Sequence, residues 1–135
     1  MVKIETNSFE QAVQQYVHTR TSQARKLIWH FIHTLPTMYF VQCGRESRPI
    51  PWITFEEEAP LALIFTSPNQ ALEAAKGLIE DVNEVRVIGL PTNAAAMYVT
   101  ALAAQGIEKV CFNHGPQRFD AHMDEVLSAL QLLVR

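Results

Sequence analysis

Cysteine is scarce in this chain of 135 residues, which holds only Cys43 and Cys111. Two thiols in apolar stretches exclude a disulfide-stapled scaffold, and we expect both to be reduced and buried in a cytoplasmic protein. The chain also lacks an apolar run near the ~20 residues that a membrane-spanning helix requires. Its first residues contain no apolar stretch typical of an export signal. These absences predict a globular, cytoplasmic protein.

Charge of either sign is limited, with 11 lysine and arginine residues, 14 aspartate and glutamate residues and a net charge of −3. Binding to nucleic acid or to an anionic membrane depends on basic surface, so this balance argues against both kinds of partner. A chain of this length suits one domain that buries roughly 68–70% of the surface of its unfolded state. With 48% hydrophobic residues, the composition is that of an ordinary globular protein.

Motifs that mark common enzymes and cofactor sites are missing. No stretch has the glycine spacing of a dinucleotide-binding turn or a P-loop, and no serine or cysteine stands in a nucleophile elbow. His30 and His33 are three residues apart, which places them on one side of a helix. Two further ligands for a closed zinc site are not evident nearby. The sequence therefore predicts no metal and no cofactor, and the missing catalytic set favours a non-enzymatic protein.

The first third of the chain predicts helix from residue 8 to residue 33. Ser8 is followed three residues later by Gln11, which is the spacing of a capping box. Apolar residues recur at helical spacing on both sides of a polar stretch at 18–23, so we expect two helices or one bent helix. Leu35 precedes a proline, which disfavours further helix and ends the segment.

A β-hairpin is predicted next. Residues 38–43 form an apolar strand, residues 44–48 a polar turn and residues 50–55 a second strand. Pro49 and Pro51 cannot donate a backbone hydrogen bond to a neighbouring strand. The second strand should therefore lie at a sheet edge or begin irregularly.

From residue 59 onward the pattern alternates between strand and helix. Apolar strands are predicted at 61–65, 85–90 and 110–112, each followed by a helical pattern, and the last helix is expected from Phe119. Such alternation implies right-handed crossovers between parallel strands, whose polar ends share one rim of the sheet.

The expected fold class is α/β, bordering on α+β. It comprises a mixed sheet of about five strands with an N-terminal hairpin, covering helices and an extra N-terminal helical segment. We expect a single domain over residues 1–135, in which residues 1–36 are the helical extension and residues 37–135 the mixed-sheet core.

Three short motifs resemble those of a known family. Residues 38–41 form a strand with a tyrosine, residues 63–68 read Leu-Ile-Phe-Thr-Ser-Pro before an alanine-rich helix, and residues 110–116 read Val-Cys-Phe-Asn-His-Gly-Pro. Together they make the segment 38–123 resemble the N-terminal domain of the SseB family, named for enhanced serine sensitivity. The resemblance implies an SseB-like domain and its fold, and it brings no established catalytic residue. The helical segment before residue 36 lies outside the likeness.

The turn Asn113-His114-Gly115 is the candidate ligand site. It stands at the carboxyl end of a predicted parallel strand, where open α/β sheets usually bind ligands. A histidine there can act as a general base or contact an anion near neutral pH. Thr92 and Asn93 stand at another strand end and could present backbone amides to an anionic metabolite. The competing interpretation is that Asn-His-Gly-Pro is only a tight turn.

Aromatic residues on the N-terminal helices form the candidate interface. Tyr16, Trp29 and Phe31 belong to types that protein interfaces favour, and this segment offers more apolar surface than one face of a small sheet needs. Homodimerisation through this surplus and simple packing over the sheet are the two alternatives. The sequence thus favours a non-enzymatic protein-binding or scaffold module that self-associates as a homodimer. The alternative function is a small-molecule site, catalytic or only binding, at the strand-end turns.

Overall fold

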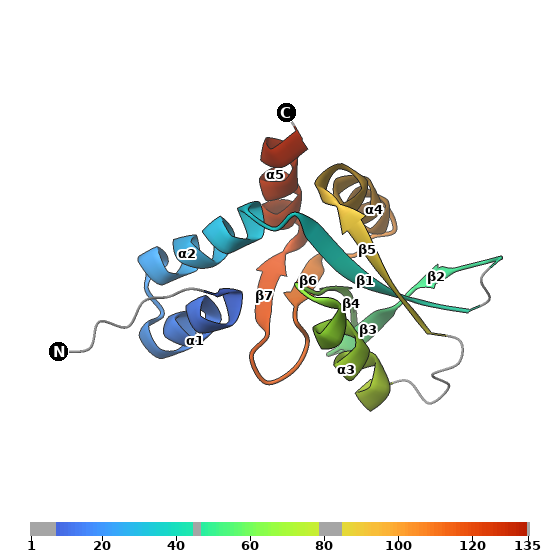
Figure 1. The fold of residues 1–135 in the computed structure, drawn as a ribbon, viewed down its shortest axis with the longest axis horizontal. Helices are drawn as coiled ribbons and strands as arrows, with labels where there is room; N and C mark the ends of the chain where they lie inside the picture. Colours follow the sequence, from blue (N-terminus) through green and yellow to red (C-terminus); the bar gives the residue numbers. More distant parts are fainter. Residues whose placement is uncertain (1–7, 45–46, 79–84, 135) are drawn as a thin grey trace.

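The computed structural model describes residues 8–44, 47–78 and 85–134, whose elements are shown in Figure 1. None of the helices within these ranges is long and apolar enough to span a bilayer. In chain order the described elements are α1 (Phe9–Thr19), α2 (Ser22–His33), β1 (Thr37–Cys43), β2 (Ile50–Pro51), β3 (Ile53–Glu56), β4 (Ala59–Ile64), α3 (Pro68–Leu78), β5 (Arg86–Pro91), α4 (Thr92–Ala104), β6 (Lys109–Phe112), β7 (Phe119–His122) and α5 (Met123–Val134).

The strands form two sheets that meet at one bridge. Their orders are β2-β1-β5 and β3-β4-β6-β7. The pair β4–β6 is parallel and the other pairs are antiparallel. Between the sheets, the backbone N–H of Tyr39 donates to the carbonyl of Phe65 (2.9 Å) and that of Phe65 donates to Tyr39 (2.8 Å). The expected mixed α/β fold is confirmed, and both β2 and β3 lie at sheet edges, as the prolines before and within this stretch predict.

One strand pairs differently from our expectation. The crossover through α3 was expected to return β5 parallel to β4 in the same sheet. Instead β5 lies antiparallel to β1, with Thr37 opposite Pro91 and Gln42 opposite Arg86. Both sides of β4 are already occupied, by β3 and by β6. The carboxyl end of β5 therefore does not belong to the rim that β4 and β6 form.

The last helix also begins later than expected. Phe119 and Ala121 are buried whereas Asp120 and His122 are exposed, which is the alternation of a strand. These four residues pair with β6, and Phe119 stands opposite Phe112. The helix α5 starts only at Met123. Four residues are too few to distinguish the spacing of a strand from that of a helix. The apolar residues of α5 continue the helical spacing that begins at Phe119, so the sequence pattern placed the start of the helix there.

Of the two alternatives for the N-terminal segment, two helices or one bent helix, the structure shows two helices. The Oγ of Ser8 accepts a hydrogen bond from the N–H of Gln11 (3.2 Å), and the Oγ1 of Thr21 accepts one from the N–H of Ala24 (3.2 Å). Arg20 ends α1 in the left-handed conformation with φ 53°. The side-chain cap at Thr21 and the left-handed residue Arg20 thus make the polar stretch a break between helices.

Helices cover both faces of the four-stranded sheet. Ala62 and Ile64 of β4 pack among residues of α1, α2, α4 and α5, whereas Leu61 and Leu63 pack against α3. Figure 1 shows α1 and α2 beside β7, α5 above β7, α4 next to β5, and α3 apart from these helices, next to β1. The N-terminal helical segment is therefore part of the same core as the sheet.

Gly89 on β5 lies beneath the ring of Tyr39 on β1. A Cβ atom at Gly89 would stand 2.9 Å from Cε1 of Tyr39 and 3.1 Å from Cγ2 of Thr37. We expect Gly89→Ala to lower the free energy of unfolding by about 1–3 kcal/mol, measured by urea denaturation, because the ring must move. In a Tyr39→Val background the same substitution should lower the free energy of unfolding by less, because only the contact with Thr37 remains. Equal losses in both backgrounds would contradict the assigned contact.

Candidate functional site

Asn113 joins the carboxyl ends of the two parallel strands. Its side chain extends from the end of β6 to Thr66, directly after β4: the N–H of Thr66 donates to Oδ1 (2.9 Å), and Nδ2 donates to Oγ1 of Thr66 (2.9 Å). Asn113 is only 4% exposed and adopts a left-handed φ of 54°, which asparagine tolerates better than most residues. These two hydrogen bonds between Asn113 and Thr66 therefore hold the shape of the turn, as the tight-turn interpretation expects.

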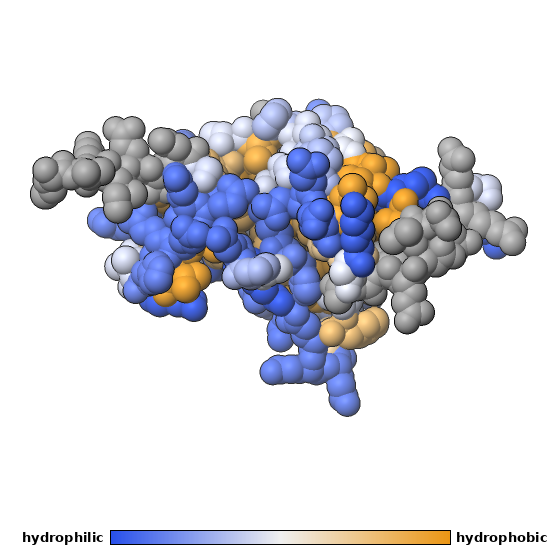
Figure 2. Space-filling model, turned by 60° about the horizontal axis from the view of Figure 1, so that its bottom comes forward, coloured by the Kyte–Doolittle hydropathy of each residue, from blue (hydrophilic) through white to orange (hydrophobic). Residues whose placement is uncertain are grey.

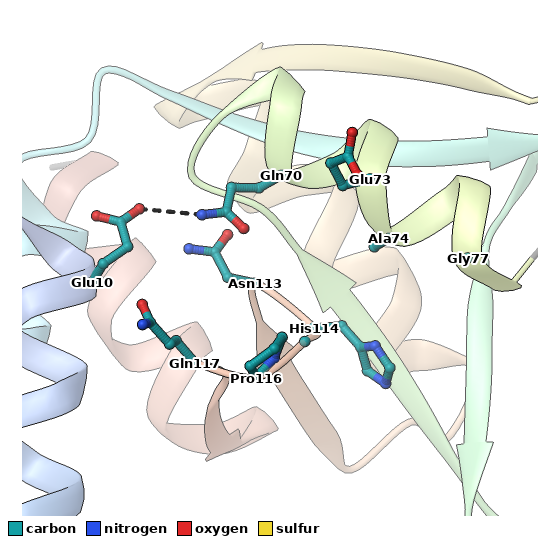
Figure 3. Close-up of a pocket in the computed structure, with 10 residues that line it drawn as sticks. Glu10, Gln70, Glu73, Ala74, Gly77, Asn113, His114, Pro116 and Gln117 are labelled. Carbon is teal, nitrogen blue, oxygen red and sulfur yellow. Dashed lines mark hydrogen bonds between the residues drawn. The ribbon is translucent and has the colours of Figure 1, made fainter.

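A pocket of about 440 Å³ opens above this turn. Its walls come from the start of α1, from α3 and from the loop between β6 and β7, as Figure 3 shows. The residues that line it are Glu10, Gln70, Glu73, Ala74, Gly77, Asn113, His114, Gly115, Pro116 and Gln117. The Nε2 of Gln70 donates to Oε1 of Glu10 (3.4 Å), which joins α3 to α1 across the pocket. The predicted turn thus borders a real hollow.

The ring of His114 does not point into this pocket. Figure 3 shows it turned away from Glu10 and Gln70, and its Nε2 lies 3.6 Å from Oε2 of Glu56. His114 therefore belongs to a charged cluster on the neighbouring surface, and the imidazole is not placed to act on a molecule in the pocket.

The centre of that cluster is Arg118. It donates to both carboxylate oxygens of Glu56, from Nη1 (2.5 Å) and Nη2 (2.8 Å), and from Nε to Asp120 (2.9 Å). These hydrogen bonds raise the pKa of Arg118, and they hold the pKa of Glu56 below its ordinary value of 4.5. The sequence did not indicate this cluster, because only the folded chain brings the end of β3 near the start of β7.

Stability at acid pH should depend on Glu56. A carboxylate with a lowered pKa in the folded state stabilises the fold above its ordinary pKa of 4.5, and it loses this contribution as the pH falls through the lowered value. Between about pH 5 and pH 3, the wild-type protein should lose roughly 0.5–1 kcal/mol more than Glu56→Gln, a modest difference because half-exposed ion pairs are screened. Denaturation curves across this range measure it. Parallel losses in the two proteins would contradict a stabilising role of the ion pair.

Thr92 and Asn93 lie apart from the turn at Asn113. They open α4 after β5, in the other sheet, and neither residue lines the pocket beside His114. Asn93 instead borders a separate hollow along α4. The five ligand-site candidates therefore do not form one site. The expected common rim exists only for β4 and β6.

The aromatic interface candidates are packed into the protein. The ring of Trp29 meets those of Phe112 (6.3 Å between centroids) and Phe119 (5.8 Å) edge-on, and Tyr16 meets Phe119 in the same way at 6.3 Å. Phe31 is half-buried against the same core. Packing over the sheet thus accounts for most of the aromatic surface on α1 and α2.

The most exposed large hydrophobic residue of the described chain lies on α4 instead. Met97 is 75% exposed, more than the other large hydrophobic residues on the described surface. Met97 borders a hollow of about 670 Å³ whose lining contains no charged residue: Asn93, Ala96, Met97, Thr100, Ala101, Ala104 and Gln131. Figure 2 shows a different character on the underside of the molecule, where hydrophilic residues predominate and apolar ones form separate patches. The apolar face of α4 is a candidate docking surface.

The two cysteines are free thiols whose burial disfavours the reactive form. Cys43 and Cys111 are both free, Cys111 is fully buried, and Cys43 is only half-buried rather than buried as expected. Burial raises the pKa of both thiols, which disfavours the reactive thiolate. Within the described residues, no group of three or more histidine, cysteine, aspartate or glutamate side chains could hold a metal ion.

Comparison with models of known protein families finds no match, and neither does comparison with curated proteins. The likeness to the SseB family therefore rests on the three sequence motifs.

Proposed function

We propose that the chain is a cytoplasmic, non-enzymatic module that associates with a second copy of itself through the exposed face of α4. The observation that carries the proposal is the 75% exposure of Met97 on a surface helix without charge. The chain has no charged residue between Arg86 and Glu108. A surface helix normally carries charged residues on its solvent side, whereas interface centres are poor in charge and rich in methionine.

The α4 face is suited to a copy of itself. Met97 stands beside the hollow that α4 forms with Gln131 of α5. A twofold axis through this face would place the Met97 of each protomer against the hollow of the other, which is the symmetry that most homodimers adopt. Ala101 and Ala104 are exposed and small, so two helices can approach closely there. Burying this face leaves no charge without a partner.

Two further observations support the rest of the proposal. The free state of both cysteines fits the reducing cytoplasm. We also propose that the domain is SseB-like, because the motif at residues 63–68 ends β4 and opens α3 while the motif at residues 110–116 ends the adjacent β6. An SseB N-terminal domain in which the corresponding strands are not neighbours would contradict this second part.

Light scattering after size-exclusion chromatography tests the dimer. The wild-type protein should have a mass near twice 15.3 kDa. Met97→Glu should return the mass to that of the monomer and leave the circular dichroism unchanged, because the exposed position tolerates the side chain whereas the interface would bury two carboxylates. Val17→Glu is the matched control, since Val17 is 51% exposed on α1 and should not affect the dimer.

Two outcomes would refute the proposal. One is a wild-type protein that remains at 15.3 kDa at high micromolar concentration. The other is a dimer that Val17→Glu disrupts as much as Met97→Glu does.

A further inference from the structure

The pocket above the Asn113 turn is negatively charged. Two of the residues that line it carry carboxylates, Glu10 on α1 and Glu73 on α3, and no lysine or arginine lines it. The one titratable ring at its border, that of His114, is turned toward Glu56 instead. An anionic metabolite would meet two like charges here without a compensating cation, so the pocket does not suit the anion that the sequence suggested.

The polar groups of the pocket stand at its two ends. Figure 3 shows the side chains of Glu10, Gln70 and Gln117 converging at one end and Glu73 farther along α3. The Gln70–Glu10 hydrogen bond uses only Oε1 of the carboxylate, and it is long at 3.4 Å. The amide oxygens of Gln70 and Gln117 are further acceptors at this end. This end therefore offers several acceptors to an N–H donor.

Part of the pocket lining is apolar. It is formed by Ala74 and Gly77, which follow Glu73 along α3, and by Pro116 of the loop between β6 and β7. A Cβ added at Gly77 would meet nothing within 4 Å, so the helix leaves space beside this wall. A short aliphatic chain can lie against such a surface while its polar ends reach the acceptors.

We infer that this pocket binds a small organic cation that carries an ammonium or guanidinium group on a short alkyl stem. The volume of about 440 Å³ lies within the range of small-molecule sites. The cationic head pairs with Glu10 and the amide oxygens, the stem lies against Ala74 and Pro116, and a second cationic group at the other end reaches Glu73. Binding of this kind is separate from self-association through α4.

Titration with 1,4-diaminobutane, followed by ¹H–¹⁵N NMR, tests the inference. Saturable shifts are expected in the backbone amides of Asn113, His114, Gly115 and Gln117 and along α3. Hexanedioate has the same four-carbon stem with carboxylates in place of the ammonium groups, and it should cause no shifts there. Glu10→Gln and Glu73→Gln should each weaken binding of the diamine about tenfold, the usual contribution of a charge-assisted hydrogen bond. Glu108→Gln removes one exposed carboxylate outside the pocket and should leave the affinity unchanged.

Three results would overturn the inference. The first is that hexanedioate binds more tightly than the diamine. The second is that neither Glu10→Gln nor Glu73→Gln lowers the affinity for the diamine. The third is that residues 113–117 show no shifts at millimolar diamine. A Met97→Glu protein should bind the diamine as the wild type does. Self-association through α4 and diamine binding in the pocket are therefore measured independently.

Discussion

Replacing Asn113 by alanine should lower the free energy of unfolding by about 2–4 kcal/mol. The substitution removes the buried carboxamide that accepts from the N–H of Thr66 and donates to its Oγ1. It also places alanine in a left-handed conformation with φ 54°, which adds about 1 kcal/mol of strain. Both effects act where β4 and β6 end side by side. Urea denaturation at neutral pH measures the loss.

Two matched variants separate the causes of this loss. Asn113→Gly tolerates the left-handed backbone and lacks the side chain, so it reports the hydrogen bonds alone. Asn113→Asp retains the acceptor for the N–H of Thr66, and the hydroxyl of Thr66 can donate to it in turn. We expect the aspartate variant to be the most stable of the three. An aspartate variant as unstable as the alanine variant would contradict the role assigned to the hydrogen bonds between residue 113 and Thr66.

Replacing Phe112 by alanine should have an even larger effect, a loss of about 3–5 kcal/mol. Phe112 is fully buried at the end of β6, where its ring contacts Phe9 of α1 and Trp29 of α2 (6.1 and 6.3 Å between centroids). These contacts anchor the N-terminal helices to the sheet. The cavity should therefore destabilise α1 and α2 first, visible as increased hydrogen exchange in residues 9–33.

Phe55→Ala provides the control for this prediction. Phe55 belongs to β3 and is 64% exposed, so the same substitution there should change the free energy of unfolding by less than about 0.5 kcal/mol. Similar losses at Phe55 and Phe112, or unchanged exchange in residues 9–33 of Phe112→Ala, would show that the helices do not depend on this anchor.

Local signals explain what could be predicted about the fold. The caps at Ser8 and Thr21 involve residues three apart in the chain, so the start of α1 and the start of α2 have local signals in the sequence, although one bent helix fitted the same pattern. The partner of β5 depends on which sides of β4 are occupied, and that is settled by strands distant in the sequence. The four residues of β7 fit helix and strand equally, and only pairing with β6 decides between them.

The residues of the candidate site could likewise be predicted only in part. A polar turn after an apolar strand predicted Asn113, but nothing local indicated that its partner is Thr66. The ring of His114 is directed by Glu56, which lies on another strand. Glu10 and Glu73 were missed because the helices that carry them approach the turn only in the folded chain. The absence of charge between Arg86 and Glu108 was visible in the sequence, and it is one of the features on which the proposed docking surface on α4 depends.

The most direct test of self-association through α4 is the solvent exposure of the Met97 methyl group. The chain contains four methionines, and Met38 and Met123, at 1% and 3% exposure, are buried internal references. In methyl-labelled protein, a soluble paramagnetic agent should broaden the Met97 signal at low concentration. At high concentration, the signal should become as protected as those of Met38 and Met123. A Met97 methyl group that stays accessible at every concentration would contradict the dimer.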